Sequence, residues 1–331
     1  MGNKSNIVVQ KENSLVNAIY RLSLEETRIF NYVIAKTNPE NHCYDHVKDF
    51  TVKEFADFYS LDGANPYREV KKALKELFKR ECTYYDNDTK MWVTCRLIVE
   101  YRDSREGRLS LKFSDQISDL IAVRKDFLNY KLEQTKGMSS ANAIRIYEVV
   151  LNTLKRERKK SKEFTFEEIK RFLGFKESEY KEFYNFRRRV LEVAKEQINK
   201  STDITFDFSV IKYGRYVTGC ILLFDWKKNA EAEAKKLDDS FALEQEKEDI
   251  QLEKELKEDS KAINFDDNKE LIKLDLAEYI EMSDRDIEYT LKLYSEEKII
   301  EQINHTLEAH GRGEIKKSKV AHFRYFIRQR S

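Results

Sequence analysis

Residues 50–55 read FTVKEF, and residues 164–169 read FTFEEI. An apolar helix is predicted before each stretch, and a basic helix is predicted after it. The offset between the two copies is 114 residues for these stretches and 117 for the helices on either side, as from Tyr67 to Tyr184. A nearly constant offset across three successive elements indicates a duplicated domain. We therefore expect one fold to occur twice in this chain.

The size and composition are typical of a soluble globular protein. The chain has 331 residues, enough for two or three domains that each bury a core, and 37% of them are charged. No apolar run approaches the roughly 20 residues of a membrane helix. Residues 1–10 also lack the apolar stretch of a secretory signal, so we expect a cytoplasmic protein.

The net charge of +1 hides an uneven distribution of charged residues. Residues 1–228 contain 43 Lys and Arg against 34 Asp and Glu, a net charge of +9. Residues 229–331 contain 18 against 26, a net charge of −8. Within this second part, residues 229–301 carry −13 and residues 302–331 carry +5. A basic body with an acidic extension indicates a polyanionic ligand for the body.

The first domain is predicted over residues 1–115. Opening helices, a helix-turn-helix and a β-meander follow one another over residues 13–37, 52–80 and 83–113. Helices followed by such strands form a winged helix, in which the hairpin is the wing. An interdomain linker over residues 116–138 is apolar enough to pack between the domains.

The second domain, residues 139–226, repeats this plan. Its helix-turn-helix is predicted from residue 166 to residue 199, and Gly214 supplies the positive φ of a tight hairpin. Residues 227–268 form a charged spacer, helical or disordered, and residues 269–331 a small helical module. The predicted fold class is α+β, with tandem winged-helix domains and a helical C-terminal extension.

The second helix of the second helix-turn-helix is the strongest candidate for contact with DNA bases. Its predicted core side, at 100° per residue, comprises Phe186, Val190, Val193, Ala194 and Gln197. A guanidinium can bond guanine through two hydrogen bonds, and an Asn side chain can do the same for adenine. The candidate DNA-binding residues on this helix are Tyr184, Asn185, Arg187, Arg188, Arg189 and Lys195.

The equivalent helix of the first domain carries mostly lysines. An ammonium group lacks the bidentate fork of arginine, so these side chains are expected to contact phosphates. The candidates are Tyr67, Arg68, Lys71, Lys72 and Lys75. The turns of the wings supply further phosphate candidates, namely Lys212, Tyr213 and Arg215 in the second domain and Arg102, Arg105 and Arg108 in the first.

The sequence offers no residues for catalysis, and we expect neither a metal nor another cofactor. It contains no GxxxxGK[ST] loop for ATP and no GxSxG nucleophile motif. The histidines form no His-x-His pair of the kind that a metal-dependent nicking enzyme needs. His42, Cys43 and His46 lack a fourth ligand in a predicted loop, so we do not interpret them as a zinc site. The four cysteines show no CxxC spacing, and reduced thiols are expected.

Residues 183–199 carry the most specific resemblance to a known family. The segment FYNFRRRVL at 183–191, continued by EQIN at 196–199, resembles the recognition helix of plasmid replication initiators, which act on theta-replicating plasmids with repeated origin sites called iterons. The segment NSLVNAIYRLSLEETRIFNYVI at 13–34 is also similar. The resemblance covers about residues 7–226 and implies two tandem winged helices. It further implies binding to direct repeats at an origin as a monomer, repression of the protein's own gene as a dimer, and recruitment of the host initiator and helicase.

Two other classes of protein share parts of this pattern. A tandem winged-helix transcriptional regulator would have the same DNA-binding features, and inverted rather than direct repeats would distinguish it. A rolling-circle nicking enzyme is disfavoured by the histidines. For residues 229–331 we predict partner recruitment. The alternatives are a helix that only stabilises the second winged helix, or single-strand binding through Arg324, Arg328 and Arg330.

Overall fold

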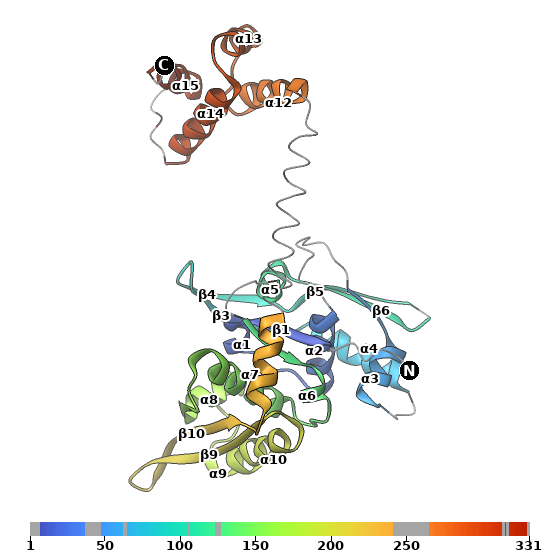
Figure 1. Ribbon diagram of the computed structural model, residues 1–331. Helices are drawn as coiled ribbons and strands as arrows, with labels where there is room; N and C mark the ends of the chain where they lie inside the picture. Colours follow the sequence, from blue (N-terminus) through green and yellow to red (C-terminus); the bar gives the residue numbers. More distant parts are fainter. Residues whose placement is uncertain are drawn as a thin grey trace. The chain divides into compact units, whose positions relative to one another are not determined.

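The computed structural model describes residues 7–36, 48–61, 65–104, 106–122, 127–240, 265–312, 315 and 318–329. The chain divides into two compact units, Met1–Gln245 and Glu246–Ser331 (Figure 1). The larger unit contains both winged helices, and the smaller unit is helical. None of the helices in these ranges is long and apolar enough to cross a membrane.

The first winged helix has the predicted elements. A buried helix comes first, a strand leads into the helix-turn-helix, and a hairpin forms the wing. Its three strands form an antiparallel sheet in the order β2-β6-β5. The elements are α2 (Leu24–Lys36), β2 (Lys48–Thr51), α3 (Val52–Tyr59), α4 (Pro66–Leu77), β5 (Ile98–Asp103) and β6 (Arg108–Phe113).

The second winged helix repeats this order, which confirms the duplicated fold. Its sheet order, β8-β10-β9, matches that of the first copy strand for strand. Its second helix is longer than the equivalent α4 and consists of α9, η2 and α10 in succession. The elements are α7 (Ala141–Asn152), η1 (Thr153–Glu157), β8 (Ser161–Thr165), α8 (Phe166–Phe172), α9 (Phe183–Phe186), η2 (Arg187–Leu191), α10 (Glu192–Ser201), β9 (Ile204–Tyr213) and β10 (Tyr216–Trp226).

The predicted β-meander of the first copy is instead two hairpins in two separate sheets. β3 (Glu81–Asp86) forms a hairpin with β4 (Met91–Arg96) and makes an isolated bridge from Thr83 to Ile19, while β5 pairs with β6. Between the two hairpins lies Leu97, which is fully buried. Its N–H donates to the Arg80 carbonyl at 3.1 Å, and its carbonyl accepts from the Ser114 N–H at 3.3 Å. The chain therefore passes from one sheet to the other at this residue. The β3–β4 hairpin has no counterpart in the second copy.

Residues 116–138, predicted as a linker, contain paired secondary structure. The segment holds most of α5 (Asp115–Ile121), β7 (Phe127–Lys131) and α6 (Glu133–Lys136). β7 pairs antiparallel with β1 (Val8–Glu12), which is followed directly by the short helix α1 (Asn13–Asn17). This segment therefore holds the start of the chain as well as connecting the two winged helices.

The two winged helices share one hydrophobic core. The reason is the position of α7, in which every residue from Ala143 to Asn152 is buried, polar residues included. A single cluster of buried side chains extends from Val9 in β1 to Phe224 in β10. The relative position of the two winged helices is thus fixed by core packing.

A buried ion cluster lies on α7 within this core. Glu148 is completely buried and accepts hydrogen bonds from Lys11 Nζ at 2.6 Å, Tyr130 OH at 2.7 Å and Asn31 Nδ2 at 3.3 Å. Arg145 lies 3.4 Å from the same carboxylate. Burial opposes ionisation of Glu148, but Lys11 and Arg145 outweigh it and lower the pKa of the carboxyl group. Asn31 and Glu148 are 117 residues apart, so they occupy equivalent positions in the two copies.

The described part of the smaller unit is a module of four helices with its own core. The core contains Ile272 and Leu276 from the first helix, Ile299 and Ile303 from the third, and Phe323 from the last. Arg324 forms an ion pair with Asp286 at 2.5 Å. The side chain of Arg328 and all of Arg330 lie outside the described residues. The helices are α12 (Phe265–Glu278), α13 (Asp284–Leu293), α14 (Glu296–Gly311) and α15 (Lys319–Gln329).

Candidate nucleic-acid interface

Both helix-turn-helix segments begin with the same capping box. The hydroxyl of Thr51 accepts from the Glu54 N–H at 3.1 Å, and the Glu54 carboxylate accepts from the Thr51 N–H at 3.2 Å. Thr165 and Glu168 make the same two bonds in the second copy, at 3.2 and 2.8 Å. The TxxE pattern within the two opening stretches of sequence was the available signal for these caps.

The turn of the second helix-turn-helix requires glycine. Gly174 has a φ of +70°, and a Cβ atom there would lie 2.7 Å from the Cβ of Arg21 and 2.9 Å from the carbonyl carbon of Tyr20. Both the backbone conformation and the available space exclude a side chain. The turn is therefore packed against the residues that precede α2, which anchors the helix-turn-helix to the first copy.

A π-helical turn changes which side chains of the second recognition helix face the core. Val193 and Gln197 were predicted to face inward but are only half-buried, whereas Leu191 and Ile198 are fully buried. A π-helical turn holds about one residue more than an α-helical turn. Beyond Arg187–Leu191 the inward side is therefore displaced by one residue. The remaining predicted core positions are buried, namely Phe186, Val190 and Ala194.

Three consecutive arginines are exposed on this π-helical turn, but their surroundings differ. Arg187 is bound to Glu192 at 2.9 Å, and its guanidinium lies 5.7 Å from the centre of the Phe208 ring. Arg188 and Arg189 make no hydrogen bond or ion pair with any residue that the structure describes. These two guanidinium groups are therefore available to a ligand without breaking an existing contact.

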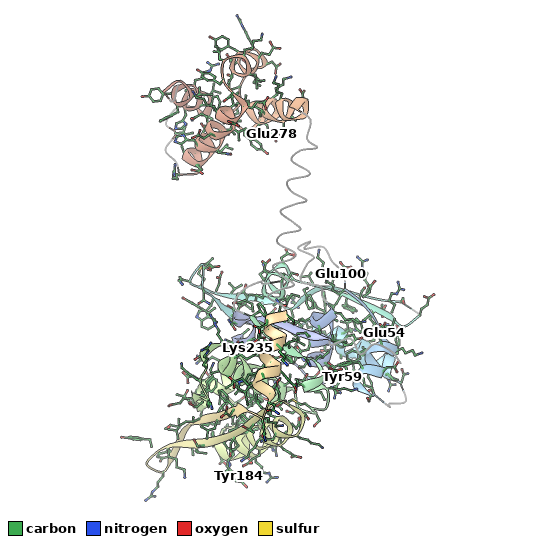
Figure 2. The ribbon with its side chains drawn as sticks, in the orientation of Figure 1. Glu54, Tyr59, Glu100, Tyr184, Lys235 and Glu278 are labelled. Atoms are coloured by element: carbon green, nitrogen blue, oxygen red, sulfur yellow. The ribbon has the colours of Figure 1, made fainter. Side chains whose placement is uncertain are left out.

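The other candidates on this helix are likewise either without an internal partner among the described residues or paired with a carboxylate. Tyr184 is 65% exposed and lies at the outer edge of the larger unit (Figure 2). The side chain of Asn185 is exposed and has no hydrogen bond within the described part of the chain. Lys195, in contrast, is half-buried and bound to Asp207 at 2.6 Å. A ligand would have to compete with that carboxylate for Lys195.

Of the candidates on α4, the four cations are exposed, whereas Tyr67 is half-buried. Arg68, Lys72 and Lys75 are exposed and form no ion pair with a described residue. Lys71 is exposed and paired with Asp103 on the wing. Tyr67 is half-buried, and its hydroxyl donates to the Ser104 carbonyl at 3.1 Å. This bond joins the recognition helix to the wing, and a DNA contact of Tyr67 stays a prediction.

The two wings, the β5–β6 and β9–β10 hairpins, project from the larger unit (Figure 1) and carry exposed cations. In the β9–β10 hairpin, Lys212 and Arg215 are exposed on either side of Gly214, whose φ is +59°. Tyr213 is 82% exposed, and Tyr216, which the sequence did not single out, is 79% exposed. In the first wing Arg108 is exposed, Arg102 is paired with Glu100, and Arg105 lies outside the described residues.

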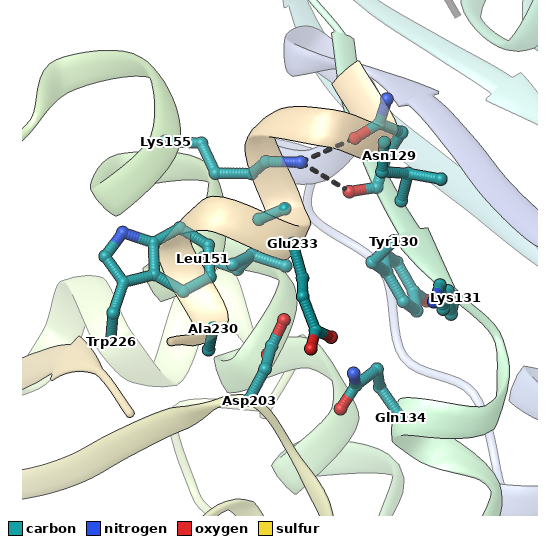
Figure 3. Close-up of a pocket in the computed structure, with 12 residues that line it drawn as sticks. Asn129, Tyr130, Lys131, Gln134, Leu151, Lys155, Asp203, Trp226, Ala230 and Glu233 are labelled. Atoms are coloured by element: carbon teal, nitrogen blue, oxygen red, sulfur yellow. Dashed lines mark hydrogen bonds between the residues drawn. The ribbon is translucent and has the colours of Figure 1, made fainter. Parts of the chain in front are cut away.

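A helix beyond the second wing packs against β7 of the connecting segment and against the second copy. Residues 230–240 are helical and line a pocket with Tyr130 of β7 and Asp203, which lies between α10 and β9 (Figure 3). Lys155 of η1 contacts both β7 and the helix at residues 230–240. Its ammonium group lies 2.5 Å from Asn129 Oδ1, 3.0 Å from the Asn129 carbonyl and 2.7 Å from Asp238. Burial lowers the pKa of Lys155, and Asp238 partly offsets this effect. Nothing in the sequence distinguished Lys155 from the neighbouring basic residues.

No group of three or more His, Cys, Asp or Glu side chains suited to a metal ion occurs in the ranges that the structure describes. His42, Cys43 and His46 fall outside those ranges.

The repeated helix, strand, helix-turn-helix and wing define a protein of two tandem winged helices. Two family models match the chain in the same order. The model described as Initiator Replication protein, WH1, matches residues 8–151, and the model described as Initiator Rep protein, WH2, matches residues 165–224. The chain belongs to this family of replication initiator proteins.

One curated relative and one solved structure are similar to parts of this chain. A replication initiation protein of Escherichia coli is 28% identical over 200 residues, which cover 59% of this chain and 63% of that protein. The match thus spans just under two thirds of the relative's length. The crystal structure of Pi initiator protein in complex with iteron DNA is similar with a TM-score of 0.56 and 21% identity, and the similarity covers 69% of this chain and 100% of that one.

Proposed function

We propose that this protein is a plasmid replication initiator that binds double-stranded DNA at directly repeated sites of an origin. The observation that carries the proposal is the pair Arg188 and Arg189, exposed and without an internal partner on the second helix of a helix-turn-helix. The N-terminal part of such a helix contacts base edges in the major groove. Each bidentate contact from an arginine contributes about 1 to 3 kcal/mol of discrimination against the wrong base.

The remaining cations support contact with the phosphate backbone. Eight candidate side chains form no hydrogen bond or ion pair within the described part of the chain, and they come from both recognition helices and both wings. Phosphate contacts position a protein on the duplex, whereas base contacts select the sequence. These eight are Arg68, Lys72, Lys75, Arg108, Arg188, Arg189, Lys212 and Arg215.

Footprinting on the DNA that flanks the reading frame tests the proposal. We expect protection of several short sites repeated in the same orientation. Protection of a single inverted repeat would instead indicate a transcriptional regulator. We also propose that the protein does not act as an enzyme, which favours an initiator over a nicking enzyme. Incubating supercoiled DNA containing the site with a divalent metal should therefore leave both strands intact.

We further infer that the chain represses its own promoter as a dimer and that the smaller unit recruits host proteins, with the host initiator and helicase as the expected partners. A negatively charged segment is repelled by duplex DNA, and a folded module on a charged arm can reach a partner while the body remains bound. We propose the domain limits 1–115, 139–226 and 269–331, with residues 116–138 and 227–268 as connecting segments. Residues 230–240, at the start of the connecting segment 227–268, pack against Lys155, which supports assigning them to the DNA-binding body.

A further inference from the structure

Two cysteines face each other in the β3–β4 hairpin of the first winged helix. Cys82 and Cys95 are directly opposite in the antiparallel register, and their sulfur atoms are 3.7 Å apart. A disulfide bond needs a sulfur separation of about 2.05 Å, so the two atoms would have to approach by about 1.7 Å. Opposed residues of an antiparallel pair also have Cα separations within the range that a disulfide spans.

The hairpin holds this pair in register on both sides. The next residues, Thr83 and Thr94, are joined by a hydrogen bond of 2.9 Å between their hydroxyl groups. Further along, the rings of Tyr85 and Trp92 are in contact, with centroids 5.5 Å apart. Cross-strand pairs of this kind fix the alignment of two strands. The two thiols therefore stay close without any rearrangement of the backbone.

The two thiols have different surroundings, which suit different chemical roles. Cys95 is partly exposed, and a hydrogen bond from Cys82, with a smaller contribution from Ser114, lowers the pKa of the Cys95 thiol to about 7. Cys82 is 1% exposed, and its hydrogen bond to Cys95 together with burial raises its pKa. Cys95 is thus the thiolate that a small oxidant can reach, and Cys82 is the partner held beside it.

We propose that Cys82 and Cys95 form an oxidation site, at which hydrogen peroxide converts the two thiols into a reversible disulfide. The Cys95 thiolate sulfur attacks one oxygen of the peroxide, the O–O bond breaks, and the leaving hydroxide takes up the proton that Cys95 released. This gives Cys95 sulfenic acid and one water molecule. The sulfur of Cys82 then attacks the Cys95 sulfur, the S–O bond breaks, and a second water leaves with the Cys82 proton. Two thiols are oxidised and one peroxide is reduced.

This site is independent of the proposed DNA contacts. The hairpin is an addition to the winged-helix plan, because the second copy has no equivalent strands. In β10, Cys220 provides a contrast within the same chain. It is fully buried, and burial raises its pKa to about 12, so it should not react with peroxide.

Peroxide treatment of the full chain, followed by alkylation of free thiols and peptide mass mapping, tests the proposal. We expect a peptide pair joined through Cys82 and Cys95, a mass loss of two hydrogens, and recovery of both thiols with dithiothreitol. The double variant Cys43→Ser/Cys220→Ser retains only this pair and should give the same result. Free Cys82 and Cys95 after treatment, or a disulfide that uses Cys43 instead, would overturn the proposal.

Single variants separate the two roles. In Cys82→Ser, dimedone should trap a sulfenic acid on Cys95, whereas Cys95→Ser should give neither adduct nor disulfide at these positions. Because Cys82 is buried, its variant is first compared with the wild type by circular dichroism. Should that variant fail to fold, the half-exposed Cys95→Ser variant remains decisive, since peroxide labelling of Cys82 in it would reverse the assigned roles.

Discussion

Replacing Glu148 with alanine should destabilise the larger unit more than any change of a surface charge. The substitution removes the only carboxylate bonded to Lys11 in the described structure, and Lys11 has a side chain that is 1% exposed. It also removes a contact of Arg145, whose side chain is 6% exposed. Two buried cations then remain without their counterion. Removing one partner of a buried ion pair costs about 3 to 5 kcal/mol, a large part of the roughly 5 to 15 kcal/mol that stabilises a folded protein.

Urea unfolding followed by tryptophan fluorescence measures this loss selectively. Both tryptophans, Trp92 in β4 and Trp226 in β10, belong to the larger unit, so the signal reports on that unit alone. Glu148→Gln retains an acceptor for Tyr130 and Asn31 but loses the charge, and we expect a smaller loss, about 1 to 3 kcal/mol. Glu76→Ala is the matched control, because it removes only the surface ion pair between Glu76 of α4 and Lys79 and should hardly move the midpoint.

The ordering of the three variants decides the outcome. If Glu148→Ala and Glu76→Ala shift the urea midpoint by similar amounts, the buried cluster does not hold the two winged helices together. If Glu148→Gln is as stable as the wild type, the charge of Glu148 contributes nothing, and only its hydrogen bonds matter.

Four further outcomes follow from the structure. Because Lys11 and Arg145 lower the pKa of Glu148, the stabilising effect of this carboxylate should be present at neutral pH and lost as the pH falls through the depressed pKa. If the difference in stability between wild type and Glu148→Gln were the same at pH 3 as at pH 7, this reasoning would be contradicted. In gel-shift titrations Arg188→Ala should lose about 1 to 3 kcal/mol of binding free energy for the repeat and relax specificity at one base pair. The control variant Lys200→Ala, on the same helix, should bind like the wild type. An equal loss of affinity for random DNA would rule out a base contact by Arg188. With roughly 6 to 10 phosphate contacts, affinity should fall by about 10³ to 10⁵ between 50 and 200 mM salt, and a flat response would argue against DNA as the ligand. Truncation after residue 245 should leave DNA affinity within a few fold but abolish replication of a plasmid that carries the origin. Truncation after Trp226 should also weaken DNA binding, because it removes the helix that covers Lys155. Replication supported by the chain cut at 245 would disprove recruitment by the smaller unit.

Local features of the fold could be predicted from the sequence because they depend on local chemistry. The helix-turn-helix segments and the turns at Gly174 and Gly214 follow from the order of apolar and basic residues and from the conformational freedom of glycine. The register beyond Arg187 could not be predicted in this way, because a π-helical turn shifts every later residue by one position and leaves no mark in hydrophobic periodicity.

Features that depend on distant contacts were missed for a different reason. The sequence around Glu148 predicts an apolar helix, and only the packing of α7 inside both copies explains why a glutamate is buried there. Lys155 likewise lies beside a solvated basic run and differs from it only through Asn129 and Asp238. The DNA-contact residues remain predictions, since the structure establishes their exposure and their internal partners but contains no DNA.

The contact between Asn31 and Glu148 joins equivalent positions of the two copies. Equivalent positions that touch one another are the signature of a two-fold axis, as in a dimer of identical subunits. Here the two halves belong to one chain and have diverged, with mostly lysines on α4 and arginines on η2. A duplex held across both halves would meet a different surface at each end and could not be turned around without loss of contacts. Successive copies of the protein on such a duplex would all point the same way.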